Sequence, residues 1–190
     1  MSIISSDPWF GRGTTLLNGA GRYAGFGDTP VAAASVPVTT VAGSVKVFAD
    51  VDPRTTNTGV VLSNRLVHCV AVRNTSGGPL LPGTVVKFKK AAIMTEVDGP
   101  AAAATDAPLG VVDEYLPAAG VANNDVFWLV VAGPTAITTA ATLAAGAFVT
   151  ATAGAAATGT QANAIGVVIT APENGRVRTL VNTGFGHSAA

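Results

Sequence analysis

Short runs in which apolar and polar residues alternate make up much of the chain after residue 36. In the run TVVKFKK, Val86 and Phe88 would point to one face of a strand while Lys87 and Lys89 point to the other. The run RVRTLVNTG, which begins at Arg176, alternates in the same way. This period of two predicts half-buried strands in an antiparallel sheet.

Two longer runs are apolar on both faces, which is typical of strands that are buried on both sides. They are RLVHCVAVRN at residues 65–74 and DVFWLVVAG at residues 125–133. Clusters of Gly, Pro, Asn and Ser, such as NTSGGPLLPG, separate the strands. Many short strands joined by such turns predict an all-β fold, a compact sandwich or barrel that occupies residues 37–190.

Residues 134–169 are rich in Ala and Thr, and this composition allows two interpretations. Ala favours a helix, but Thr recurs throughout, and Gly146, Gly154 and Gly159 divide the segment into short pieces. Because Thr and Val prefer pleated strands and Gly marks turns, we expect strand, loop and strand here. A short helical turn is expected near residues 140–143.

The same order of signals occurs twice, which predicts an internal repeat with units at residues 66–133 and 134–187. The first unit contains LLPGTVVK and then LGVV, and the second contains LAAGAFVT and then IGVV. Each unit has a turn glycine and a second glycine where a strand bends or another backbone comes close. These glycines are Gly83 and Gly110 in the first unit and Gly146 and Gly166 in the second. A fainter third copy is VAGSVKV followed by TGVVL at residues 58–62. The alternative is chance similarity in a chain rich in Ala, Val and Gly.

Residues 1–36 form a segment of a different kind, in which aromatic residues and arginines are spaced by many glycines. No helical or strand period is sustained, and Gly is costly to order. Because aromatic and Arg side chains are enriched where proteins contact partners, we predict an extended arm that becomes ordered against another protein. The expected contact residues are Trp9, Phe10, Arg12, Arg22, Tyr23 and Phe26. The alternative is a tail in which the aromatic residues are incidental.

Low charge is the feature of composition that bears most on function. The 190 residues carry 11 basic and 11 acidic side chains, and only 12% of the residues are charged. A surface with so little charge favours association, so we expect a homo-oligomer. Nucleic-acid binding, which usually needs a basic excess, is not expected. No apolar run reaches the length of about 18 residues that a membrane span needs.

No combination of residues in the chain matches a catalytic, cofactor-binding or metal-binding motif, so an enzyme is not expected. The two histidines, His68 and His187, are not expected to form a metal site. Asp113 and Glu114 are adjacent, so they would point to opposite faces of a strand or be solvated in a turn. The single cysteine, Cys69, lies in an apolar run and is expected to be a buried thiol.

A small basic patch is expected on the β-domain from Arg73, Lys87 and Lys89. Such a group of charges is usually a solvated face of the protein. The sharper interpretation is a contact with an acidic protein partner.

The passage VAVRNTSGGPLLPGTVVKFK, followed by LGVV and NNDVFWLVVAGP, resembles the capsid decoration or cement proteins of tailed bacteriophages. The resemblance covers residues 66–185, and its motifs are turn glycines and valine strands. It implies a structural virion protein, made in the host cytoplasm, that binds the capsid exterior and cements neighbouring major capsid subunits. It also implies a homotrimer at three-fold positions of the shell, and it brings no catalytic residues.

A head fibre or a glycan-binding adhesin on the virion is the alternative function. An adhesin would gather exposed aromatic residues in its loops to stack on sugars. Loops such as AGAAATGTQANA contain no aromatic residue. The sequence therefore favours the decoration role, with the major capsid protein and further copies of the chain as partners.

Overall fold

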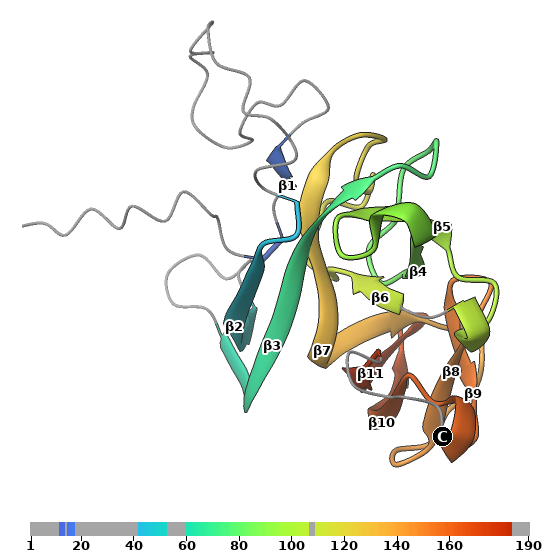
Figure 1. Cartoon of the computed structure of the whole chain (residues 1–190). Coiled ribbons are helices and arrows are strands. Elements are labelled where there is room, and N and C mark those ends of the chain that lie inside the picture. The colour runs from blue at the N-terminus through green and yellow to red at the C-terminus, as the bar shows by residue number, and fades with distance from the viewer. Residues whose placement is uncertain (1–11, 14, 18–41, 53–59, 107–108, 184–190) are drawn as a thin grey trace, which may run out of the picture.

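The computed structural model describes residues 12–13, 15–17, 42–52, 60–106 and 109–183 (Figure 1). Its long elements are strands, as the alternating pattern predicted, and within these ranges there is no α-helix. The strands are β1 (Thr15–Leu17), β2 (Val45–Asp52), β3 (Val60–Asn74), β4 (Val85–Phe88), β5 (Glu96–Pro100), β6 (Leu109–Val112), β7 (Val126–Thr138), β8 (Phe148–Thr152), β9 (Ala155–Thr158), β10 (Gly166–Glu173) and β11 (Arg176–Asn182). Three 3-10 turns join some of them: η2 (Lys90–Ala92), η3 (Ala104–Asp106) and η4 (Gln161–Asn163). The all-β class is confirmed.

Five of the strands close into a small barrel. The hydrogen-bonded order is β3-β5-β4-β6-β7, and β7 pairs again with β3. All of these pairs are antiparallel except β3 with β5. Apolar side chains that point inward from all five strands fill the barrel, and Phe127 and Leu129 of β7 are its largest fully buried members.

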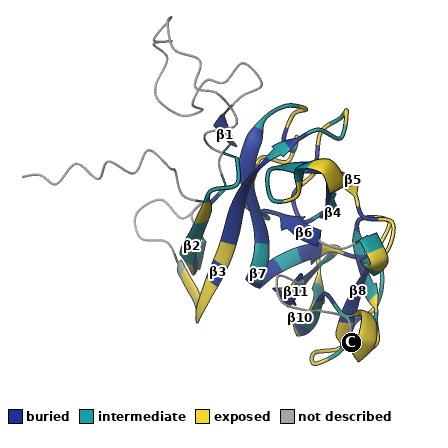
Figure 2. Ribbon diagram, viewed as in Figure 1, coloured by how far each residue is buried: buried dark blue, intermediate teal, exposed yellow. Residues whose placement is uncertain are grey.

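Strands β8 to β11 form a second ring on the other end of β7. Here the order is β7-β11-β10-β8-β9, and a parallel bridge from Thr139 to Ala156 joins the end of β7 to β9. Strand β7 therefore belongs to both rings, which explains why it is long and buried at most positions (Figure 2). Trp128 packs in the second core, with the ring of Phe48 from β2 at 5.5 Å in a T-shaped contact.

The two rings repeat one plan, element by element. Strands β4, β5, β6 and β7 of the first ring correspond in order to β8, β9, β10 and β11 of the second, and η3 corresponds to η4. The register is also the same, because Val86 lies opposite Gly110 in β4–β6 and Val149 lies opposite Gly166 in β8–β10. The two Gly-Val-Val sites of the sequence therefore occupy matching positions.

The turn glycines of the repeat also make matching backbone bonds. Gly83 donates its N–H to the carbonyl of Val112 over 2.9 Å, and Gly146 donates to Val168 over the same distance. Both glycines have positive φ, +79° and +83°, a conformation that other residues rarely adopt. Each marks the point where the chain enters the first strand of its unit.

A third copy of this turn begins at Gly43. Gly43 has a φ of +95° and donates its N–H to the carbonyl of Ala71, whose own N–H bonds back to Ser44. The sequence correctly identified the first half of this copy, VAGSVKV. Its second half is wrong, because the equivalent partner positions are at residues 69–71 of β3 rather than at residues 58–62.

Two further expectations need correction. Residues 140–143 contain no helical turn, because the chain there runs as an irregular connection to β8. The N-terminal arm does not extend unbroken over residues 1–36, because β1 pairs with β7 and buries Leu16 and Leu17 completely in the core. Burial of the two leucines contributes about 3–6 kcal/mol, which is of the same size as the backbone entropy lost by ordering three residues.

Candidate functional site

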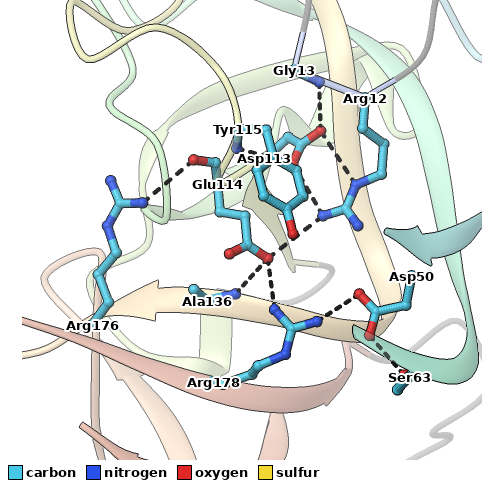
Figure 3. A network of polar contacts seen from close by, with 10 residues as sticks. All are labelled: Arg12, Gly13, Asp50, Ser63, Asp113, Glu114, Tyr115, Ala136, Arg176 and Arg178. Carbon is cyan, nitrogen blue, oxygen red and sulfur yellow. Dashed lines mark hydrogen bonds and ion pairs between the residues drawn. The ribbon is translucent and has the colours of Figure 1, made fainter. Parts of the chain in front are cut away.

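A buried ion pair fixes the N-terminal segment to the β-domain (Figure 3). The guanidinium of Arg12 bonds to the carboxylate of Asp113, with Nη2 to Oδ1 at 3.0 Å and Nε to Oδ2 at 3.4 Å. The two side chains are 3% and 0% exposed. The carboxylate also accepts the backbone N–H groups of Gly13 and Tyr115. Asp113 is thus satisfied by one charged donor and two neutral donors.

Two local features allow Arg12 to enter this site. Gly13 has a φ of +85°, and a Cβ on it would lie 2.9 Å from the Cβ of Tyr115, so only glycine fits. The guanidinium of Arg12 lies over the Tyr115 ring, with its central carbon 4.8 Å from the ring centroid. The carboxylate and the π-face compensate the burial of Arg12 in part, while its Nη1 is buried with no hydrogen-bond partner among the described residues.

The network extends from Glu114 across the molecule to β2, β3 and β11. Glu114 Oε1 accepts from the Ala136 N–H over 3.1 Å and from Arg178 Nη1 over 3.2 Å. Arg178 bonds with its other nitrogen to Asp50, which in turn accepts from the Ser63 hydroxyl over 2.6 Å. Charged groups from four separate parts of the chain therefore meet in one network, which the neutral Ser63 extends to β3.

Burial and the neighbouring charges shift the pKa values of this network. Desolvation raises the pKa of Glu114, and the charges of Arg178 and Arg12 only partly offset the rise. Desolvation alone would lower the pKa of Arg12, but the surrounding groups, Asp113 foremost and Glu114 among them, together raise it above the ordinary value. Arg12 is accordingly a permanent cation. The network is a structural clamp, since its carboxylates face protein donors rather than an open cleft.

Sequence reasoning missed this clamp. Arg12 was expected to contact a partner, but a side chain with this burial is not a surface anchor. Asp113 and Glu114 were expected to be solvated or to point apart, but Asp113 is buried, the Glu114 side chain is only 10% exposed, and both face arginines. The signal that could have found them is their position directly after the buried strand LGVV, where a free carboxylate would be costly without a cation.

The other predicted arm contacts lie outside the described residues. They are Trp9, Phe10, Arg22, Tyr23 and Phe26.

The basic patch on the β-domain is broken up by acids. Lys89 Nζ forms an ion pair with Glu96 at 2.9 Å, and Glu96 is also the strand partner of Arg73. Arg73 donates to the Asn124 amide oxygen over 2.7 Å. Lys87 lies near Asp106, whose pKa is lowered chiefly by two backbone N–H groups and to a smaller extent by Lys87. The structure therefore places a mixed-charge surface where the sequence predicted a basic one.

An exposed apolar face on β2 and β3 was also missed. Val45 and Val47 are 63% and 45% exposed, and Leu66 on the neighbouring strand is 56% exposed. The alternating pattern of VKVFADV reads as a strand with a buried Val face, but the buried side of β2 is the one that carries Phe48. The other face carries Lys46, Asp50 and Asp52 beside Phe48, so alternation alone favours burial of the valines, and the structure shows the opposite.

Within the described ranges, no three His, Cys, Asp or Glu side chains are placed to hold a metal ion. The same ranges hold no helix that is long and apolar enough to span a membrane. Cys69 is fully buried, as predicted, and burial raises the pKa of its thiol strongly. His187 lies outside the described residues.

Comparison with known proteins gives one structural match. No family model matches the chain. No curated protein matches it either. The crystal structure of the head fiber gp8.5 N base in bacteriophage phi29 is similar with a TM-score of 0.42 and 11% sequence identity, over 61% of this chain and 94% of that chain. A likeness at this level establishes neither a shared family nor a shared function.

Proposed function

We propose that the protein is a structural component of a phage virion that binds the capsid exterior and cements neighbouring major capsid subunits. The proposal starts from the resemblance of residues 66–185 to decoration proteins. It includes a homotrimer on the shell, with the major capsid protein as the partner. The virion surface is then the place where the protein acts.

The observation that carries the proposal is the anchoring of Arg12 and β1 on the β-domain. Phe10 is two residues before Arg12, so their Cα atoms are separated by at most about 7 Å. The proposal assigns the role of shell-contacting anchors to Trp9 and Phe10, which precede the clamp in the chain. Aromatic anchors that are tethered in this way lose less entropy on binding than anchors on a free tail.

Cementing suits a rigid β-domain that carries an anchored aromatic segment. A shell is held by many weak lateral contacts, and a protein that spans a junction adds contact area on both sides of it. Two modest contacts made by one molecule reinforce each other through effective concentration. The low net charge allows close approach to a shell of either sign.

The location of the protein on the particle tests the proposal. Shells with and without the protein would be compared by cryo-electron microscopy. Cementing predicts difference density that bridges adjacent capsid subunits at three-fold or quasi-three-fold positions. Density that stands away from the shell on a single contact would favour the head-fibre alternative, and no density on the shell would overturn both.

A further inference from the structure

Among the described strands, β2 has fewer strand neighbours than its counterparts in the repeat. Strand β4 lies between β5 and β6, and β8 lies between β9 and β10. Strand β2 begins at the equivalent turn, Gly43, but among the described strands it pairs only with β3 and ends the sheet (Figure 1). The place that a return strand fills in both other copies is thus not taken by any described strand.

The face beside this edge is apolar. Val45, Val47 and Ala49 alternate along β2 with Lys46 and Phe48 and are exposed. Leu66 lies opposite Ala49 on β3, and His68 lies opposite Val47. Figure 2 shows exposed ribbon along the free ends of β2 and β3. Exposed valines on an edge strand are the feature that proteins usually avoid unless the edge has a partner.

A groove of about 310 Å³ continues this face toward the barrel. Apolar side chains of Val45, Val70, Met94 and Val131 line it. His68 is the single ionisable residue in its lining. The face and the groove together offer an apolar, nearly uncharged surface next to a strand edge with which no described strand pairs.

We propose that this surface is where a second copy of the chain docks, by antiparallel pairing of β2 with β2. A two-fold contact brings the same surface to both sides, so it must be self-complementary. Pairing centred on Phe48 would set Val45 opposite Val51 and Val47 opposite Ala49, which is apolar against apolar along the whole outer face. Main-chain hydrogen bonds along the edge would add to this burial.

The lack of charge is the argument for a copy of the chain rather than another protein. A surface that selects a different partner usually does so with complementary charges. Here no charged side chain lies among Val45, Val47, Ala49 and Leu66. The inference is independent of the virion role, because it concerns the purified chain alone.

The test is the mass of the purified full-length chain in solution, by analytical ultracentrifugation over a concentration range up to about 100 µM. The wild-type chain is expected to show a concentration-dependent dimer, formed through a contact distinct from any three-fold contact made on the shell. Val47→Glu is expected to weaken self-association at least about tenfold, because it would place two carboxylates in an apolar interface. The matched control is Leu81→Glu, because Leu81 is 53% exposed and lies in the turn before β4.

Ala49→Lys provides a second variant in case Val47→Glu fails to fold, which circular dichroism and thermal melting would show. A wild-type chain that is monomeric at the highest concentration would overturn the proposal. So would an assembly that survives Val47→Glu and Ala49→Lys, or one that Leu81→Glu dissociates equally. A chain that is monomeric in solution but binds shells, and whose shell binding is abolished by Val47→Glu, would overturn the proposal and assign the face to the capsid instead.

Discussion

At the scale of single residues, the clamp around Asp113 joins the N-terminal segment to the chain just after β6. Its carboxylate is fully buried and accepts bonds from Arg12, Gly13 and Tyr115. A buried pair of this kind adds little net stability compared with an apolar pair of the same size. Removing one partner is far more costly, because it leaves an uncompensated charge.

Arg12→Ala is therefore expected to lower the free energy of unfolding by about 3–5 kcal/mol. Urea denaturation of the full-length protein would measure the loss. The matched control is Lys89→Ala, because the Lys89–Glu96 pair is at a similar distance but its lysine is 43% exposed. That exposed pair should contribute less than about 1 kcal/mol. Equal losses for the two variants would contradict the account of the clamp.

Cys69 gives a second prediction at this scale. Its thiol is fully buried and its pKa is raised, so very little thiolate is present at neutral pH. A thiol reagent such as DTNB should fail to modify the native protein and should react once per chain after denaturation. Rapid modification of the native protein would show that β3 opens readily or that the thiol is accessible.

At the scale of elements, each repeat unit has one turn glycine and one close-approach glycine. They are Gly83 and Gly110 in the first unit and Gly146 and Gly166 in the second. A Cβ on Gly166 would lie 2.5 Å from the carbonyl oxygen of Leu180, which is backbone and cannot move aside. A Cβ on Gly110 would instead overlap the side chain of Leu129. Strands approach each other closely at both positions. A side chain at Gly166 would meet backbone atoms, whereas one at Gly110 would meet a side chain.

Gly166→Ala is accordingly expected to destabilise the protein more than Gly110→Ala, with losses of about 1–3 kcal/mol or more. Thermal melting of the two variants would rank them. Gly78→Ala is the control, since a Cβ there would meet no atom within 4 Å. A ranking in which Gly78→Ala is as damaging as Gly166→Ala would rule out the close-approach explanation.

The repeat was predictable and the N-terminal strand was not, for a physical reason. Gly83 and Gly146 leave a local signal, because a turn with positive φ requires glycine in a short window of sequence. Leu16 and Leu17 have no such signal, since two apolar residues among glycines do not reveal a partner strand 110 residues away. The Arg12–Asp113 pair could not be predicted from the sequence for the same reason, since the two residues are 101 positions apart.

At the scale of the whole molecule, the chain is two rings on a shared strand with an N-terminal segment clamped beside them. This architecture changes what an N-terminal truncation should do. Deleting residues 1–10 leaves Arg12 and β1 in place, so the melting temperature should change little. Deleting residues 1–30 removes Leu16, Leu17 and the cation of the clamp, so the melting temperature should fall by many degrees. Equal melting temperatures would show that β1 does not stabilise the domain.

The exposed face of β2 could not be predicted because the pattern favours the wrong side. Val45, Val47 and Ala49 share one face while Lys46 and Asp50 share the other, so alternation favours burial of the valine face. The packing of Phe48 on Trp128 and the burial of Asp50 show that the other side is the core. Patterning tells which residues share a face of a strand. It does not tell which face a neighbouring layer covers.

Co-sedimentation with undecorated phage shells tests the proposed capsid binding most directly. The full-length protein is expected to pellet with the shells and to saturate at a fixed ratio to the major capsid protein. Trp9→Ala combined with Phe10→Ala should weaken that binding at least about tenfold, which corresponds to about 1.4 kcal/mol, while melting stays unchanged. A full-length protein that stays in the supernatant at every concentration would contradict the capsid-binding role.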